Sequence, residues 1–471
     1  MNMLFLVPEM EELANEWKLA EKIVSQEITA AHSRGEKLKY LKIRRKDYPH
    51  FVHSYLFIHG ELYRMDKSRY LGIGAFGKIK LIYTSTGKVR VIKITAADEN
   101  NPLHSDAEFA KNVRRVKEKL GEETHSFIRT FTEEKILIKH PFNPLFEIKA
   151  KSKRIQLDYL AGEKSLYSVL QKETLLYTQK TLIAILACVE VETLHAVREI
   201  HRDIKSSNYR IAIDANNPLN IILHLVDRDF ATELPSRKSK LISENAPYRI
   251  TPGFNAPETV SKKELSCKAD IYSLGVLLGD ELKLTSSQTI ISNPAKAVIA
   301  AMKNASAEKR PEIHEVVSNL WNELPSSLRN AGYLRDTKIA VERLQLLAAA
   351  RKTVDHFNKS PPFCRYFLWR RHQSQQDLFL LQLTNAVKIA ENSFSLSNEN
   401  LVILFTDALN TSPSATFPLS RSMHFLGKNL LGNNFKGSPE QLRQMLYDKV
   451  NALKEPIENE QSSYLRKNIC V

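Results

Sequence analysis

Residues 69–95 read RYLGIGAFGKIKLIYTSTGKVRVIKIT, which is a glycine-rich loop between two alternating apolar segments, followed by a third such segment. Alternation of apolar and polar residues predicts strands on both sides of the loop, and Thr86-Gly87 predicts a turn into the third strand. Glycine has no Cβ, so such a loop lets the backbone approach phosphate oxygens closely. A dinucleotide-binding fold needs a helix after this loop, and the strand that follows here argues against that class.

Lys93 stands at the end of the third predicted strand, in the sequence VRVIK. A lysine at a strand end is either solvated or a cation that binds phosphate. Because the glycine loop lies only one hairpin away, the sequence favours phosphate binding.

A second group of polar residues follows a strongly apolar helix predicted over residues 178–197. The sequence HRDIKSSN, residues 201–208, contains one carboxylate, two cations and an asparagine. Further along, LHLVDRDFATEL begins at Leu223 as an apolar strand and runs into Asp227. A carboxylate at the end of a buried strand is unusual, because a buried charge is costly unless it has a partner. The sequence therefore indicates a chemical role for Asp227.

The composition is that of an ordinary globular protein of 471 residues, with 43% apolar and 26% charged residues. This length predicts about two to three folded units. The net charge of +15 suits an acidic partner or a phosphate-bearing ligand, and a lysine-rich solvated surface is the more common cause. The four cysteines show no zinc-binding spacing and indicate a reducing compartment. No apolar run approaches the roughly 18 residues of a membrane span, so we expect a cytoplasmic protein.

Apolar residues recur at helical spacing in other parts of the chain. Residues 8–33 and residues 106–139 are predicted to be helical, and a hairpin is predicted around His59-Gly60. From about residue 326 to the last residue, the sequence is predicted to be mostly helical.

Taken in order, these motifs resemble the eukaryotic-like protein kinase family over about residues 66–322. The resemblance implies an α+β, bilobal fold with a small β-rich N-lobe and a helical C-lobe. Four segments are expected: an N-terminal extension over residues 1–65, the N-lobe over 66–157, the C-lobe over 158–325, and an additional C-terminal helical domain over 326–471.

The resemblance implies an ATP site in the N-lobe. Lys93 matches the lysine that grips the α- and β-phosphates, and residues 157–160 match the hinge that hydrogen-bonds adenine. Glu133 of TEEKILIKHP best matches the helical glutamate that pairs with this lysine. Glu134 is the alternative, and a simply solvated side chain is the other interpretation of either residue. The implied ATP-binding residues are Gly72, Ile73, Gly74, Ala75, Phe76, Gly77, Ile79, Lys93, Asp158 and Leu160.

The resemblance also implies the residues of phosphoryl transfer. Asp203 matches the catalytic aspartate, which orients the substrate hydroxyl and accepts its proton, and Lys205 is typical of serine/threonine kinases. Asn208 and Asp227 match the ligands of Mg²⁺, with Mn²⁺ as the alternative metal.

Arg228 and Asp229 depart from the family, which has Phe and Gly after the metal-binding aspartate. That Phe normally packs between the lobes, and the Gly gives the backbone freedom to move. The departures therefore concern the regulatory switch and not the metal site. We expect a kinase that does not flip between two states of this motif, with the Arg228 stem packed where the Phe would lie.

The sequence after this motif carries further matches. Residues 251–258 match the segment that closes the activation loop and faces the peptide, and Asp270 matches the aspartate that braces the catalytic loop. Glu258 is expected to form a buried ion pair with Arg310. Arg202 implies a phosphate in the activation loop. The candidate phosphorylation sites are Ser236, Ser239 and Ser243, and ordinary loop serines are the alternative.

The expected function is an ATP- and Mg²⁺-dependent serine/threonine protein kinase that acts on a protein substrate. The alternatives are a pseudokinase scaffold that binds nucleotide or a partner, and a kinase of a lipid or small molecule. The diverged core with unfamiliar flanks also resembles the kinases that intracellular bacterial pathogens such as Legionella deliver into host cells. On that hypothesis the protein is secreted into the host cytoplasm and its C-terminal helical domain binds a host protein. Peripheral membrane contact is a further candidate, and no specific nucleic acid partner is expected.

Overall fold

The structure is a computed structural model that describes residues 6–38, 40–44, 51–58, 60–74, 77–86, 89–97, 106–120, 125–130, 152–159, 164–242, 251–262, 264–359, 373–392, 398–410, 421–431 and 439–454. The chain divides into two compact units. The N-terminal unit comprises residues 1–114, 123–163 and 459–471, and the C-terminal unit comprises residues 115–122 and 164–458.

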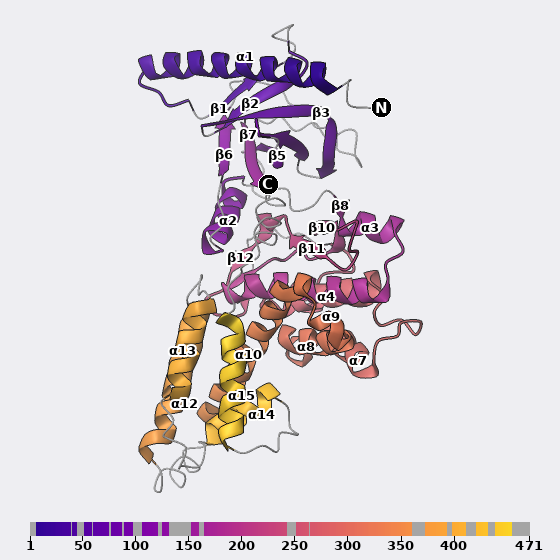
Figure 1. Ribbon diagram of the computed structural model, residues 1–471, viewed down its shortest axis with the longest axis vertical. Helices are drawn as coiled ribbons and strands as arrows, with labels where there is room; N and C mark the ends of the chain where they lie inside the picture. Colours follow the sequence, from indigo (N-terminus) through magenta and orange to yellow (C-terminus); the bar gives the residue numbers. More distant parts are fainter. Residues whose placement is uncertain are drawn as a thin grey trace. The chain divides into compact units, whose positions relative to one another are not determined.

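An antiparallel sheet of seven strands forms the centre of the N-terminal unit, in the order β1-β2-β3-β4-β5-β7-β6 (Figure 1). The predicted hairpin at residues 59–60 joins β2 to β3, and Gly60 there has a φ of 97°, a conformation that side chains disfavour. The strands are β1 (Tyr40–Ile43), β2 (Ser54–Ile58), β3 (Glu61–Gly74), β4 (Gly77–Tyr83), β5 (Val89–Ala97), β6 (His125–Thr130) and β7 (Ser152–Tyr159).

Helix α1 (Leu6–Ser33) packs against the β1–β2 part of this sheet (Figure 1). Ala20 and Val24 of the helix are buried in a cluster with Tyr55 of β2. Glu16 of α1 is buried as well, and its carboxylate accepts hydrogen bonds from the Tyr55 hydroxyl at 3.0 Å and the His53 ring at 2.8 Å. Apolar contact and these hydrogen bonds together fix the helix on the sheet.

The helix predicted over residues 106–139 is wrong at residues 125–130, and residues 131–139 lie outside the described residues. Helix α2 ends at Lys119 (Asp106–Lys119), and β6 (His125–Thr130) pairs along its whole length with β7. The alternation in HSFIRT fits a strand, and the backbone hydrogen bonds of β7 supply the pairing that a sequence window does not reveal.

Helices around one large apolar core build the first part of the C-terminal unit. Helix α4 (Tyr177–Ala196) is buried on most of its surface, as its nearly continuous apolar sequence predicts. Helix α6 (Cys267–Val276) continues into a π-helical turn, Leu277–Glu281, in which the N–H of Leu282 donates to the Leu277 carbonyl. The other helices are α3 (Leu166–Lys172), α5 (Pro257–Lys262), α7 (Asn293–Met302), α8 (Ile313–Glu323) and α9 (Ser326–Arg329).

The C-terminal unit also contains short strands, which are joined by its loops. The sheet order is β11-β10-β8, and two further antiparallel pairs are β9 with β12 and β13 with β14. The strands are β8 (Lys164–Ser165), β9 (Glu199–Ile200), β10 (Tyr209–Ile213), β11 (Ile221–Leu225), β12 (Thr232–Glu233), β13 (Leu241–Ile242) and β14 (Glu264–Leu265). With the sheet of the N-terminal unit, these elements confirm the expected α+β fold.

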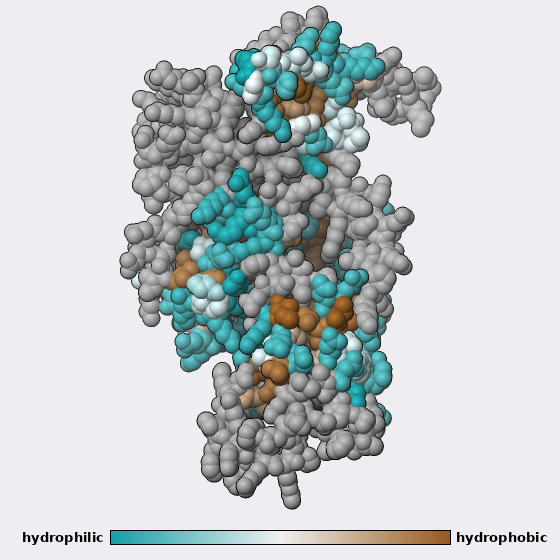
Figure 2. Space-filling view, turned by 90° about the vertical axis from the view of Figure 1, so that its left-hand side faces the viewer, coloured by the Kyte–Doolittle hydropathy of each residue, from teal (hydrophilic) through white to brown (hydrophobic). Residues whose placement is uncertain are grey.

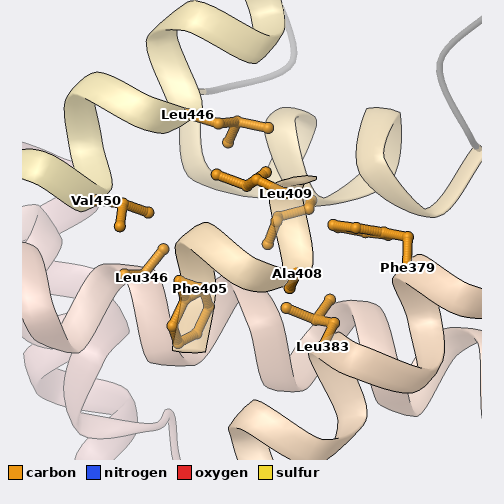
Figure 3. A pocket seen from close by; sticks show the side chains of 9 residues that line it. Leu346, Phe379, Leu383, Phe405, Ala408, Leu409, Leu446 and Val450 are labelled. Atoms are coloured by element: carbon orange, nitrogen blue, oxygen red, sulfur yellow. The ribbon is translucent and has the colours of Figure 1, made fainter. Parts of the chain in front are cut away.

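Within the described residues after 334, five α-helices follow, as predicted for the C-terminal region, and they enclose a second apolar core. Helix α10 belongs to both cores, because Val341 lies in the first and Leu346 in the second. In Figure 3 the side chains of Phe379, Phe405 and Leu409 converge in the interior, and the space between them is too small for a water molecule. The helices are α10 (Arg335–Lys359), α12 (Gln373–Asn392), α13 (Asn398–Asn410), α14 (Arg421–Leu431) and α15 (Pro439–Asn451).

Figure 2 shows one face of the described surface. On the face shown in Figure 2, hydrophilic side chains predominate among the described residues, and hydrophobic ones form small separate patches. Among the helices of the described ranges, none is both long enough and apolar enough to cross a membrane.

Candidate active site

A buried aspartate, Asp270, anchors the loop that contains Asp203. Asp270 of α6 accepts the backbone N–H of His201 at 2.7 Å and that of Arg202 at 2.9 Å, which confirms the predicted bracing role. Burial opposes the charge of Asp270, but hydrogen bonds from His195 and His201 outweigh it and hold its pKa below the ordinary value. Arg202 itself has a φ of 71°, so this anchoring offsets a strained backbone.

His201 links this loop to the strand that leads into Asp227. Its Nε2 donates to the Val226 carbonyl at 3.0 Å, and its Nδ1 accepts the N–H of Asp203 at 3.3 Å. One nitrogen donates and the other accepts, so the ring is neutral. Burial disfavours the charged form and lowers the pKa of His201, in agreement with a neutral ring.

The carboxylate of Asp203 is the centre of a cluster of polar side chains. Lys205 Nζ lies 2.9 and 2.8 Å from its two oxygens, and the Thr251 hydroxyl donates to Oδ1 at 2.8 Å. Asn208 Nδ2 donates to Oδ2 at 2.9 Å and to the Asp203 carbonyl at 2.7 Å. Three donors from separate positions thus fix one carboxylate that is only 4% exposed.

The β10–β11 hairpin brings Asn208 and Asp227 to the same end. Tyr209 pairs with Leu225, and the N–H of Val226 donates to the Asn208 carbonyl at 2.8 Å. Because Asn208 uses its Nδ2 on Asp203, its Oδ1 is the end that remains for a cation. A carboxylate and an amide oxygen are hard donors that suit Mg²⁺, so the residues fit this metal.

The predicted ion pair between Glu258 and Arg310 is confirmed. Both guanidinium Nη atoms bind the carboxylate, at 2.6 and 2.7 Å, and the arginine side chain is fully buried. Its Nε also donates to the Asn304 carbonyl at 2.8 Å. The pair fixes the end of the segment that contains Thr251.

In the N-terminal unit, the sheet places the predicted ATP-binding positions on neighbouring strands. Gly74 at the end of β3 pairs with Gly77 at the start of β4, and Lys93 of β5 lies opposite Ile79 of β4. Asp158 of β7 pairs with Val91 of β5, and Gly72 and Ile73 belong to β3. The predicted residues Ala75, Phe76, Glu133 and Leu160 lie outside the described residues.

Comparison with known protein families agrees with this architecture. Residues 65–323, more than half of the chain, match the family described as "Protein kinase domain". The chain belongs to the protein kinase domain family.

Relatives of this kinase domain include several proteins named as serine/threonine kinases. The chain is 29% identical to serine/threonine-protein kinase shk2 of Schizosaccharomyces pombe over 185 residues, which cover 39% of the chain and 29% of that protein. It is 27% identical to serine/threonine-protein kinase pak-1 of Caenorhabditis elegans, over 44% of the chain and 36% of that protein. Serine/threonine-protein kinase PAK 1 of Mus musculus is 29% identical, over 34% of the chain and 27% of that protein. The chain thus spans about a third of the length of these relatives.

The departure of this kinase domain after Asp227 has a defined local structure. Asp227 adopts a φ of 66°, and Arg228–Phe230 form one 3-10 turn in which Asp229 and Phe230 are buried. Arg228 is half-buried and lies within electrostatic reach of Glu190. Packing of its stem in place of the family Phe stays a prediction.

A glutamate that the sequence did not reveal holds the loop of residues 203–208 in this kinase domain. Glu281, at the end of the π-helical turn, accepts the Ser206 hydroxyl at 2.7 Å and its N–H at 3.2 Å. Burial raises the pKa of Glu281. No local signal reveals this contact, because it depends on an extra residue in a helical turn.

Proposed function

We propose that this chain is an ATP- and Mg²⁺-dependent protein-serine/threonine kinase. The observation that carries the proposal is the Asp203 carboxylate, which Lys205, Thr251 and Asn208 hold in one orientation. Phosphoryl transfer depends on positioning and on neutralising charge, so a fixed carboxylate beside metal-binding oxygens is the arrangement it requires.

The reaction assigned to this site moves the γ-phosphoryl group of ATP to a serine or threonine hydroxyl. The hydroxyl oxygen forms the new bond to the γ-phosphorus while the bond to the β–γ bridging oxygen breaks and ADP leaves. Asp203 orients the hydroxyl and accepts its proton. The Lys205 ammonium, which lies beside the Asp203 carboxylate, would stabilise the negative charge of the phosphoryl group during transfer. A Mg²⁺ ion held by Asn208 and Asp227 would neutralise phosphate charge.

The roles of the N-terminal unit belong to the same proposal. The loop between Gly72 and Gly77 would cover the phosphates, and Lys93 would grip the α- and β-phosphates with Glu133 as its partner. Asp158 and Leu160 would bind adenine. Supporting this, the glycine loop, Lys93 and Asp158 lie on adjacent strands β3, β4, β5 and β7 in the register described above.

A finer proposal concerns the cellular role. We propose that the substrate is a host protein and that the chain is an effector secreted into the host cytoplasm. The support is the diverged core with unassigned flanks and the polar, glutamate-containing sequence of residues 453–471. Fusion to a reporter that becomes active only inside host cells tests this, and the signal should disappear when residues 453–471 are deleted.

The decisive experiment for catalysis is transfer of labelled γ-phosphate from Mg·ATP by the purified full chain, to itself and to a generic basic protein. We expect incorporation on serine or threonine that is lost in Lys93→Met and Asp203→Asn. Absent incorporation with ATP still bound would favour the pseudokinase scaffold, and Arg228 would then be the first residue to revert to Phe. Transfer only to a lipid or a small molecule would replace the protein substrate.

A further inference from the structure

The strand that follows the metal-binding turn is tied to the catalytic loop. Strand β12 pairs with β9, which directly precedes His201, and the N–H of Leu234 donates to the Arg198 carbonyl at 2.7 Å. In this pairing Glu233 lies opposite Glu199, so two like charges face each other across the strands. Such a pair is unfavourable unless cations lie against it.

The last turn of α2, within the C-terminal unit, supplies those cations. Arg115 donates to both oxygens of Glu199 at 2.8 and 2.9 Å and also to the Ala231 carbonyl at 2.9 Å. Lys119 Nζ lies 2.7 Å from Glu199 and 2.9 Å from Glu233, bridging the two carboxylates. The Glu199 side chain is fully buried, so its contacts with Arg115 and Lys119 are not surface pairs, whereas Glu233 at the edge of the network is 45% exposed.

The next part of the segment is anchored by Arg237. Both of its terminal nitrogens bind the carboxylate of Glu192 of α4, at 2.5 and 2.7 Å, and Arg351 of α10 lies 3.9 Å from the same carboxylate. Glu192 is only 6% exposed and Arg237 17% exposed. Lys238 adds an exposed pair with Asp355 of α10 at 2.9 Å. The additional helical domain thus contributes α10 to the surface that holds this segment.

Arg202, the arginine next to the catalytic aspartate, is also engaged within the segment. Its guanidinium donates to the Thr232 hydroxyl at 3.1 Å and lies 3.5 Å from the Phe230 carbonyl. Of the three serines predicted as phosphorylation sites, Ser236 and Ser239 hydrogen-bond each other at 2.8 Å on an exposed turn, and Ser243 lies outside the described residues. The neighbouring cations Arg237, Lys238 and Lys240 each lie against a carboxylate.

A phosphate orders a loop by giving arginines and lysines a new anionic partner. For residues 228–242, Glu192 and Glu264 already fill that role as the partners of Arg237 and Lys240, and Lys119 of α2 binds Glu233 of the segment. We propose that these built-in ion pairs hold the segment in its working position, so that transfer does not require phosphorylation of this segment. Arg237 and Glu192 are then positioning residues, and α10 supports them. This inference rests on the proposed kinase activity.

The first test compares the full chain before and after treatment with a phosphatase, with the loss of phosphate checked by intact mass. The initial rate of transfer to a basic protein should agree within about twofold, and the Ser236→Ala/Ser239→Ala/Ser243→Ala variant should behave the same. A rate that falls about tenfold or more on dephosphorylation and returns on autophosphorylation would overturn the inference while leaving the kinase proposal intact. Absence of transfer in both samples would overturn the proposed function and this inference with it.

The second test separates positioning from folding. Arg237→Met should lower kcat/KM for the protein substrate by about tenfold or more and leave the KM for ATP unchanged, because the segment pairs with the strand that precedes His201 and not with the strands proposed to bind ATP. Arg237→Lys keeps a cation opposite Glu192 and should retain most of the rate. The matched control is Lys238→Met, whose side chain is 78% exposed and whose loss should change the rate by less than about twofold. Equal losses in Arg237→Met and Lys238→Met, or an unchanged Arg237→Met, would contradict the inference.

Discussion

The kinase C-lobe and the C-terminal helices α10–α15 are both built around apolar cores, but they differ in what else they bury. Among the described residues of the helices, the buried polar side chain is Thr353, whose hydroxyl donates to the Ala349 carbonyl of its own helix. The C-lobe buries many charged or titratable side chains. They are Glu192, His195, Glu199, His201, Asp203, Asp229, Glu258, Asp270 and Arg310.

Apolar burial and buried charges have different consequences, the first for stability and the second for the geometry of the site. An apolar core stabilises by removing surface from water, and it needs no specific partners. A buried charge gains little net stability, because desolvation offsets the attraction of its partner. Most of the buried charges of the C-lobe lie around the loop that contains Asp203 and the segment after Asp227, and their contacts hold these two stretches of backbone in position. Helix α10 connects the two regions, because it contributes residues to both cores.

The largest expected effect is on the rate. Asp227→Asn removes the charge proposed to face the metal, and we expect kcat to fall by about 10²–10³-fold with little change in unfolding temperature. Measuring the rate against Mg²⁺ concentration checks this. Asp214→Asn at the exposed tip of the same hairpin is the control and should keep the wild-type rate. Equal losses in both variants would mean that the hairpin matters only as a structure.

The next effect concerns stability of the C-lobe. Glu258→Gln leaves the fully buried Arg310 guanidinium without its anionic partner, and we expect a loss of about 3–5 kcal/mol in the free energy of unfolding. Urea titration measures it. Breaking the exposed pair by Lys303→Met should cost less than about 1 kcal/mol. A small effect of Glu258→Gln would place this pair with the surface ion pairs.

A change in the second core should affect stability without affecting chemistry. Leu409→Ala creates a cavity among the side chains of Figure 3, and we expect a loss of about 2–5 kcal/mol with a kcat close to wild type. Hydrogen exchange of α13 and the transfer rate measure the two quantities. Ile403→Ala, on the same helix but 55% exposed, is the control. A rate that fell together with stability would show that the helices act directly on the site.

The smallest effect is expected from acid. In four carboxyl groups of the C-lobe, burial opposes the charge but cations and hydrogen bonds outweigh it, so each pKa lies below its ordinary value of 4.5, or 3.8 for Asp270. The groups are Glu190, Glu192, Asp270 and Glu312. The unfolded chain then takes up protons at a higher pH than the folded one, so stability is complete above about pH 5 and declines as the pH falls below it.

Calorimetry between pH 7 and pH 4 checks this expectation. The transition that Glu258→Gln lowers should move down with pH, and the transition that Leu409→Ala lowers should move less. Parallel movement of both transitions would contradict the contrast between the two cores.

Features set by neighbouring residues were predicted from the sequence. Period-two alternation and a glycine turn gave the β3–β4–β5 strands, because strand faces alternate with every residue. Asp203, Lys205 and Asn208 lie within six residues, so their clustering follows from one short loop. The resemblance to kinases added the long-range contacts of Asp270 and of Glu258 with Arg310, which the structure confirms.

Only the tertiary structure decided which distant charges meet. Glu199 and Arg115 are 84 residues apart, and Glu192 and Arg237 are 45 apart. Each side chain taken alone is an ordinary solvated charge in the sequence. The strand β6 within a predicted helix has the same origin, since its partner β7 lies beyond the window in which periodicity is seen. Backbone periodicity is local, whereas the partner of a buried charge is chosen by the packing of whole elements, and this is why the sequence alone predicted the candidate catalytic residues but not the ion pairs proposed to position them.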